Sequence, residues 1–134
     1  GRLERRAAEL KVEADVDWMG VTPNPLPFVR EADALVLSTF YEGLPTVLIE
    51  ALYVGTTPVA TDAPGGIREI VEDGRYGYIV PVRDVPALSE GMLEALRQPM
   101  PRRMLQERAE VFSEKRAVDA YLELFGMIGV ARDA

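Results

Sequence analysis

Two glutamates separated by seven residues, Glu42 and Glu50, are the side chains of this sequence best suited to binding a ligand. Pro45 lies between them and favours the first position of a helix, so Glu42 precedes the predicted helix and Glu50 lies inside it. Carboxylates accept paired hydrogen bonds from neighbouring hydroxyls, as the acidic residue of dinucleotide-binding folds does with ribose. The pair therefore suits a ligand that carries hydroxyl groups at both of its ends.

The start of this helix is itself suited to a phosphate. The N–H groups of Thr46 and Val47 lack partners within the helix and lie at the positive end of its dipole. Glu50 lies about 7.5 Å along the axis from Pro45, and its side chain leans back toward the helix start. A diphosphate with ribose at one end and a sugar at the other would satisfy both glutamates, which predicts a nucleotide sugar.

A plainer interpretation fits the same spacing. Glu42 is favourable near a helix start through the dipole alone, and Glu50 on a solvated face needs no ligand. Gly43 would then be a turn residue with positive φ. Gly65 and Gly66 would form only a tight turn, instead of a second loop whose backbone approaches the diphosphate. Spacing alone favours this interpretation, because short motifs often match by chance.

Further polar and aromatic residues near these loops have both structural and functional interpretations. Asp62 fits the start of a turn or helix better than a catalytic acid. Arg68 and Arg75 are candidates for phosphate clamps, but exposed arginines are usually solvated. The tyrosines fit the core or its rim better than a stacking platform; they are Tyr41, Tyr53, Tyr76 and Tyr78.

The residue types that are missing narrow the chemistry. The 134 residues include no histidine and no cysteine, so a Ser-His-Asp triad, a disulfide and a thiolate metal site are not available. The net charge of −7 argues against a nucleic-acid partner, which would need a basic surface. No apolar run reaches the length of a membrane span. We therefore expect one domain over residues 1–134 and a cytoplasmic location.

Short apolar segments alternate with helical patterns along the chain. The run at 34–38 is continuously apolar, which is typical of a strand buried on both faces, and the helix over 84–98 carries one apolar stripe. That stripe consists of Val85, Leu88, Met92 and Leu96. The predicted strands are 16–21, 34–38, 57–61 and 76–80; the predicted helices are 2–12, 28–32, 45–54, 67–74, 84–98 and a closing pair over about 102–128.

This alternation predicts an α/β fold, a doubly wound parallel sheet flanked by helices. Ligands of such sheets bind at the carboxyl ends of the strands. The loops 39–45 and 62–66 follow two of the predicted strands, so we expect them to converge at one edge of the sheet.

The segment from 32 to 88 closely resembles the donor-binding part of family 4 glycosyltransferases, which are retaining, sugar-nucleotide-dependent enzymes of the GT-B fold. The resemblance is carried by EGLPTVLIEAL, with its glutamates seven residues apart, and by three elements that follow in the same order as in the family. These are a PVAT strand, a Gly-Gly-x-x-Glu-Ile turn and a Gly-x-x-Val-Pro segment. The combination of YEGLP with TDAPGG looks most like members that build bacterial surface glycans or lipid-linked sugars.

The resemblance implies a role for each matched residue. Glu42 would be the catalytic-site carboxylate that binds hydroxyls of the donor sugar, together with the backbone of Gly43 and Leu44. Glu50 would hold the ribose diol.

The same resemblance places the diphosphate at the N–H groups of Thr46 and Val47, with Gly65 and Gly66 forming a second loop beside it. The helix dipole would offset the charge that develops on the departing diphosphate. The family generally works without a structural metal, and the sequence shows no cluster of metal ligands, so we expect no metal and no cofactor besides the nucleotide-sugar substrate.

A GT-B enzyme has two doubly wound domains, and this chain can supply only the latter part of the second. The resemblance implies that upstream strands with an Arg/Lys pair and an acceptor-binding N-terminal domain are missing, so that this fragment alone is inactive. The parent enzyme would transfer a sugar, from a UDP-sugar by preference, to a glycan or lipid-linked acceptor in polysaccharide biosynthesis.

The resemblance also bears on where the parent enzyme works and on what it assembles with. We expect it in the cytoplasm, with peripheral association at the inner face of the membrane. A truncated sheet would expose an edge through which oligomers could form. Two alternatives remain, a non-catalytic doubly wound binding or interaction domain and a GT-B sugar-nucleotide epimerase relative.

Overall fold

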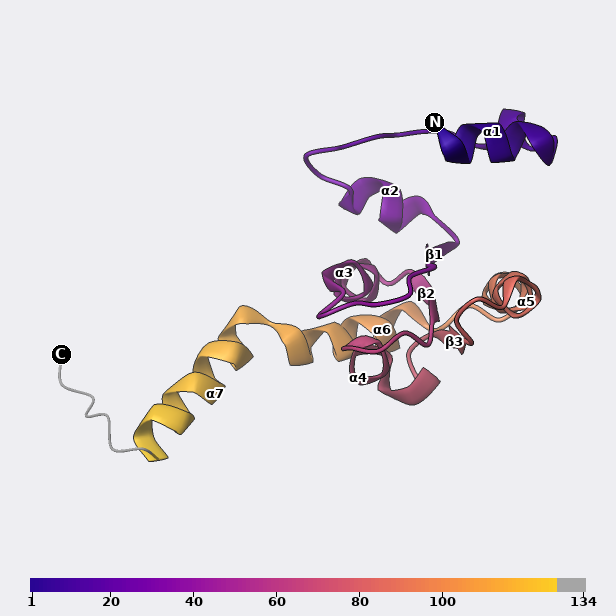
Figure 1. The fold of residues 1–134 in the computed structure, drawn as a ribbon. Helices are drawn as coiled ribbons and strands as arrows, with labels where there is room; N and C mark the ends of the chain where they lie inside the picture. Colours follow the sequence, from indigo (N-terminus) through magenta and orange to yellow (C-terminus); the bar gives the residue numbers. More distant parts are fainter. Residues whose placement is uncertain (128–134) are drawn as a thin grey trace.

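The computed structural model describes residues 1–127 and contains a three-stranded parallel sheet (Figure 1). The strand order is β1-β2-β3, with Ala34 opposite Thr57 and Val59 opposite Tyr78. Helices α3 and α4 connect successive strands, which gives the βαβ units that the sequence predicts. The α/β fold class is therefore confirmed. The bounds are β1 Ala34–Leu37, α3 Thr46–Val54, β2 Thr57–Thr61, α4 Ile67–Val71 and β3 Tyr78–Val80.

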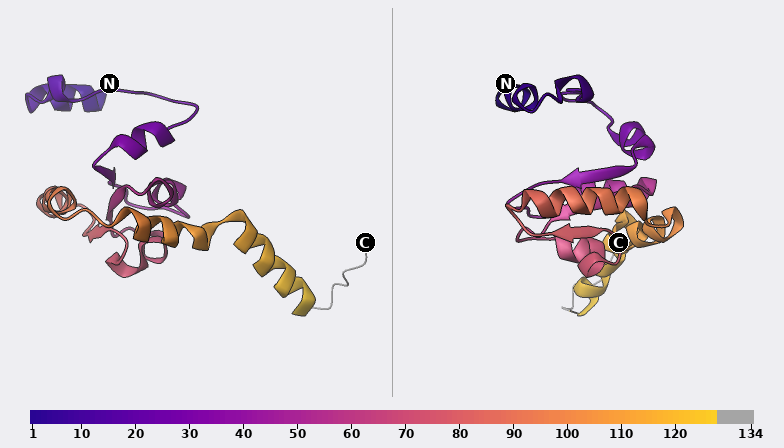
Figure 2. Two further views of the ribbon diagram at one scale, coloured as in Figure 1. Left: turned by 180° about the vertical axis from the view of Figure 1, so that it is seen from behind. Right: turned by 90° about the vertical axis from the view of Figure 1, so that its right-hand side faces the viewer.

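Helices cover both faces of this sheet. Helix α5 (Val85–Arg97) packs on one face, and α3, α4 and α6 (Arg102–Ala109) lie on the other (Figures 1 and 2). The core lies between the sheet and this second group of helices, and its largest side chains are fully buried. They are Leu48, Leu52, Ile67, Ile70 and Leu105.

Helix α3 ends where its sequence predicts and begins one residue later, at Thr46 instead of Pro45. Pro45 occupies the N-cap position, one residue before the first helical residue. The missing N–H group of proline costs little there, because an N–H at the start of a helix has no partner within the helix. Gly55 ends the helix in the left-handed conformation with φ of 80°. Leu48 and Leu52 face the core, while Tyr53 is exposed on the opposite side.

The segment 16–21 is not a strand, so this prediction was wrong. A strand is stabilised by hydrogen bonds to a neighbouring strand, and none of the strands in residues 1–127 pairs with this segment. Trp18 and Val21 are accordingly exposed.

Strand β1 was predicted to be buried on both faces, and this was also wrong. Val36 is 38% exposed, and the other residues of β1 are half-buried. Within residues 1–127, β1 pairs only with β2, so its other side is an open edge of the sheet.

The apolar stripe on α5 does not form its buried face. Val85, Met92 and Leu96 are exposed, whereas Gly91 and Ala95 face the sheet. A Cβ at Gly91 would lie 2.9 Å from Val80 Cγ1 and 3.3 Å from Val59 Cγ1, so the helix packs through its smallest side chains. The predicted N-cap is confirmed, because the Asp84 carboxylate accepts a hydrogen bond from the Ala87 N–H at 2.9 Å.

The N-terminal helices lie to one side of the sheet. Helix α1 (Arg2–Glu9) is joined to the domain by a long segment and lies apart from the strands, whereas α2 (Leu26–Glu31) packs on α3 (Figures 1 and 2). The Thr56 hydroxyl, just after α3, donates to the carbonyl of Val29 in α2 at 2.6 Å.

The closing pair of helices is confirmed as α6 and α7 (Glu114–Met127); residue 128 of the predicted pair lies outside the described residues. Helix α7 extends away from the sheet (Figure 2). Several of its apolar side chains are exposed there, including Val118, Tyr121, Leu122 and Phe125.

Candidate functional site

The two loops predicted to converge lie in direct backbone contact. The Glu42 N–H donates to the carbonyl of Pro64 at 3.2 Å, and the Gly66 N–H donates to the carbonyl of Gly43 at 2.8 Å. Gly65 adopts φ of +124°, and a Cβ there would lie only 1.8 Å from the Glu42 carbonyl oxygen. Glycine at 65 is therefore required both by its own conformation and by the contact between the loops.

Hydroxyl groups fix the beginning of the first loop. The buried Thr61 hydroxyl, at the end of β2, donates to the carbonyl of Thr39 at 2.5 Å. The Thr39 hydroxyl in turn donates to the carbonyl of Tyr41 at 3.0 Å. These bonds hold the loop after β1 against β2, so the backbone that leads to Glu42 has a fixed position relative to the sheet.

The N-terminus of α3 opens at this same edge of the sheet. Among the described residues, no side chain caps the helix. The Leu48 N–H turns back to the carbonyl of Pro45 at 3.0 Å, and Thr46 is exposed at the first helical position. The N–H groups of Thr46 and Val47 precede the first bond of the helix and form the positive end of its dipole.

Glu42 and Glu50 flank this helix start and are both half-buried. Neither carboxylate forms an ion pair with another residue of the described part of the chain. Their oxygens are therefore not neutralised by a cation of the chain itself. What each carboxylate binds stays a prediction.

Gly43 has an ordinary backbone conformation, so the interpretation of this residue as a positive-φ turn was wrong. A Cβ there would meet open space, and the residue is exposed. The positive φ required by these two loops is at Gly65 instead. Leu44 is exposed beside Gly66, with its Cδ1 atom 3.1 Å from the position of a Cβ at Gly66.

Arg68 braces the second loop. Its Nε donates to Asp62 Oδ1 at 2.8 Å and its terminal nitrogen to Asp62 Oδ2 at 2.6 Å, while the other terminal nitrogen donates to Asp73 at 2.8 Å. These hydrogen bonds lower the pKa of the Asp62 carboxyl and raise the pKa of the Arg68 guanidinium. The guanidinium is thus engaged by two carboxylates, which argues against the phosphate-clamp interpretation of Arg68.

Arg75 has a carboxylate partner as well, because it pairs with Glu72 at 2.9 Å, and its guanidinium carbon lies 5.2 Å from the centroid of the Tyr76 ring.

The tyrosines were expected in the core or at its rim. This is confirmed for Tyr76 and Tyr78, which are half-buried. It was wrong for Tyr41 and Tyr53, which are exposed.

The structure also shows a hollow that sequence reasoning did not find. A cavity of about 230 Å³ lies between the end of β1 and the start of α5. The Arg83 guanidinium carbon lies 5.5 Å from the centroid of the Phe40 ring at this cavity. The one signal in the sequence was an aromatic residue two positions before Glu42. The lining includes Ser38, Phe40, Thr61, Arg83, Asp84 and Leu88.

Larger cavities of about 420 and 450 Å³ lie at the other end of α3, around Arg30 and Tyr53, and not at the converging loops. No group of three or more acidic, histidine or cysteine side chains within residues 1–127 could hold a metal ion. None of the helices in this part of the chain has the length and apolar character needed to cross a membrane.

Comparison with known proteins gives one family. Residues 1–112 match the family described as glycosyl transferases group 1. A Campylobacter jejuni protein named N-acetylgalactosamine-N,N'-diacetylbacillosaminyl-diphospho-undecaprenol 4-alpha-N-acetylgalactosaminyltransferase is 26% identical over 126 residues, covering 94% of this chain and 32% of that protein. A lipopolysaccharide core biosynthesis glycosyltransferase of Rhizobium meliloti is 28% identical over 127 residues, covering 91% and 37%.

A poly(glycerol-phosphate) alpha-glucosyltransferase of Bacillus subtilis is 24% identical over 122 residues, covering 91% of this chain and 18% of that protein. The chain thus spans between 18% and 37% of the length of these three relatives. The family match covers well over half of the chain, and the parallel sheet flanked by helices is consistent with the Rossmann-like C-terminal domain of such enzymes. The chain belongs to the family of glycosyl transferases group 1.

Proposed function

We propose that this chain is the donor-binding part of a retaining, family 4 glycosyltransferase of the GT-B fold. The parent protein would transfer a sugar from a nucleotide-diphosphate sugar, UDP by preference, to a glycan or lipid-linked acceptor. The observation that carries this proposal is the uncapped start of α3, flanked by Glu42 and Glu50, neither of which has a cationic partner in the described chain.

The donor would lie across this helix start. Its diphosphate accepts hydrogen bonds from the N–H groups of Thr46 and Val47, where the dipole favours negative charge. Glu50, further along α3, accepts hydrogen bonds from the two ribose hydroxyls. Glu42, on the other side, accepts them from the sugar hydroxyls, with the backbone of Gly43 beside it.

Transfer breaks the bond between the sugar and the diphosphate, so negative charge develops on the departing phosphate oxygen. The fixed N–H groups at the start of α3 stabilise that charge without having to reorganise. The contact between Gly65 and Glu42 and the hydroxyl bonds of Thr61 support this function, because they keep the loop in place before the donor arrives. The proposed chemistry requires no metal or cofactor.

The chain would perform this function only as part of the longer protein. The open edge of β1 offers a place where further strands of the same sheet can pair. We propose that those strands supply the cationic residues for the diphosphate, and that an N-terminal domain supplies the acceptor site. The names of two relatives, which refer to an undecaprenol-linked substrate and to lipopolysaccharide core biosynthesis, support a role in polysaccharide biosynthesis. We place the parent protein in the cytoplasm, at the inner face of the membrane, as part of this proposal.

The proposal is tested by calorimetric titration of the full-length parent protein with UDP. Glu50→Ala should weaken UDP binding about tenfold or more, because hydrogen bonds to a charged group are lost. Glu123→Ala, on the exposed face of α7, is the matched control and should bind UDP like the wild type. Failure of the parent protein to bind UDP, or equal binding by the Glu50→Ala variant, would overturn the donor-site proposal.

A further inference from the structure

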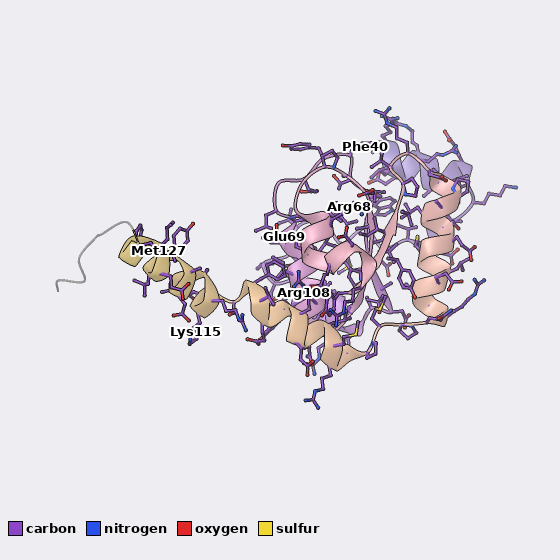
Figure 3. All side chains as sticks on the ribbon, turned by 90° about the horizontal axis from the view of Figure 1, so that it is seen from below. Phe40, Arg68, Glu69, Arg108, Lys115 and Met127 are labelled. Atoms are coloured by element: carbon purple, nitrogen blue, oxygen red, sulfur yellow. The ribbon has the colours of Figure 1, made fainter. Side chains whose placement is uncertain are left out.

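The cavity between β1 and α5, here called the edge pocket, lies beside the proposed donor site but is not part of it. Its lining comes from the loop after β1, from Thr61 at the end of β2, and from the residues that begin α5. Figure 3 shows Phe40 at the same end of the sheet as Arg68, which braces the second loop. The volume of about 230 Å³ is below the range of about 300–1,000 Å³ usual for drug-sized ligands, so the edge pocket suits one small ring.

Phe40 and Arg83 form an unusual pair at the rim of the edge pocket. Phe40 is 65% exposed, although burial of an aromatic side chain is strongly favourable. Arg83 has φ of 62°, a conformation that is costly for a residue with a Cβ. Backbone strain of this kind is typical of functional positions, where the rest of the structure maintains it.

The guanidinium of Arg83 keeps its hydrogen-bonding capacity. It lies over the Phe40 ring and forms no ion pair with a residue in the described part of the chain. Asp84 uses one carboxylate oxygen to cap α5 and retains the second oxygen as an acceptor. The hydroxyl of Ser38 lies at the same cavity and can both donate and accept.

The edge pocket has the groups that recognise a neutral sugar. They are an exposed aromatic face, a guanidinium, a carboxylate and a hydroxyl. The apolar C–H face of a pyranose ring packs on the aromatic ring, and its hydroxyls find both donors and acceptors. The carboxylate of Asp84 makes an anionic ligand less suitable, because it lies beside the only cation among the lining residues.

The position of the edge pocket suggests which sugar it binds. Phe40 precedes Glu42 by two residues, which span at most about 7 Å of extended chain. A sugar in the edge pocket would therefore lie next to the donor sugar that Glu42 is proposed to bind. We propose that the edge pocket binds one sugar unit of the acceptor glycan, so that the donor-binding domain itself helps to orient the acceptor; this rests on the proposed transferase function.

The test is an NMR titration of the ¹⁵N-labelled chain with neutral methyl hexosides and with maltotriose, to high millimolar concentration. Binding should shift the amide signals of 38–40 and 83–85. Phe40→Ala should weaken binding about fivefold, Phe40→Tyr should retain it, and Tyr41→Ala is the matched control. Tyr41 is adjacent and is also exposed, at 75% against 65% for Phe40, but it does not line the edge pocket.

Arg83→Gly separates binding from structure. Glycine removes the backbone strain, so this variant should have a higher melting temperature than the wild type and yet bind the hexosides more weakly. A residue with only a structural role would not give this combination. Unchanged hexoside affinity in Arg83→Gly overturns the proposal.

Three other outcomes test the edge pocket and the donor site separately. If UDP binds the parent protein in a Glu50-dependent manner but no hexoside shifts 38–40 or 83–85 in the chain, the edge-pocket proposal fails and the proposed function stands. If inorganic phosphate shifts these signals and hexosides do not, the edge pocket is an anion site and the proposal is wrong. Hexoside binding here, with no UDP binding by the parent protein, overturns the donor-site proposal, and the edge pocket is then a sugar site without the proposed acceptor role.

Discussion

Gly65 and Glu42 meet backbone to backbone, so closely that a Cβ on residue 65 would lie 1.8 Å from the Glu42 carbonyl oxygen. This contact joins the loops that follow β1 and β2, and it fixes the backbone that carries the first glutamate of the proposed donor site. The position of Glu42 therefore depends on a residue that has no side chain to bind a ligand.

We expect Gly65→Ala to destabilise the protein and to displace the Glu42 loop. Alanine is strained at φ of +124°, and its Cβ would overlap with the Glu42 carbonyl. Together these effects should lower the free energy of unfolding by about 2–4 kcal/mol. Urea denaturation measures this loss, and UDP titration of the parent protein should show weaker binding. Gly43→Ala is the matched control, because its Cβ meets open space and its φ is ordinary. Equal stability of the two variants would contradict the proposed role of the contact.

The pair of Asp62 and Arg68 should make stability depend on pH. The hydrogen bonds from Arg68 lower the pKa of Asp62 in the folded state, so the pair stabilises the fold above the pKa of an unfolded aspartate, about 3.9. That stability is lost as the pH falls through the lower, folded-state pKa. Asp62→Asn should therefore cost stability at pH 7 and much less at a pH below this folded-state value.

Urea denaturation of both proteins at the two pH values measures this difference. Asp119→Asn is the control, because Asp119 pairs with Lys115 in an exposed pair on α7, and such pairs contribute only a few tenths of a kcal/mol. A cost of Asp62→Asn that does not change with pH would mean that the charge of Asp62 is not what stabilises the second loop.

Arg108 links α6 to the C-terminal end of α4 (Figure 3). Its guanidinium donates to the carbonyls of Glu69 and Ile70 and lies 5.4 Å and 5.1 Å from the ring centroids of Tyr76 and Phe112. The side chain is 14% exposed, so these interactions are largely shielded from water.

We expect Arg108→Ala to lower the free energy of unfolding by about 2–3 kcal/mol, because two carbonyls lose their donor and two rings lose a cation. Arg108→Lys should restore only part of this, since an ammonium group cannot reach both carbonyls and stack on both rings at once. Thermal denaturation compares both variants with Arg103→Ala. The Arg103 side chain is 91% exposed, so this substitution should hardly change the stability. If Arg108→Lys were as stable as the wild type, the positive charge alone would account for the contribution of Arg108 to stability.

Local patterns predicted the elements that position the proposed site. The proline before α3, the glycine after it and the alternation of strands and helices were sufficient to place the loops of Glu42 and Gly65 at one edge. The strand expected at 16–21 was wrong because pairing depends on a neighbour that local sequence does not specify. The pairing of Arg68 with Asp62 and the stacking of Arg83 on Phe40 depend on side-chain directions that spacing does not determine.

The packing of α5 was the other feature that periodicity could not predict, and it gives the last prediction. An apolar stripe normally faces the sheet, but here Gly91 and Ala95 do, because small residues allow the helix to approach closely. Gly91→Ala should therefore destabilise the domain by about 1–3 kcal/mol, although alanine is the better helix former by about 1 kcal/mol. Gly126→Ala on α7 is the matched control: its Cβ meets open space, so only the propensity gain remains and helix content by circular dichroism should rise. If Gly91→Ala is instead as stable as the wild type in urea, α5 has shifted outward, and the amide signals of 83–85 at the edge pocket should then move with it.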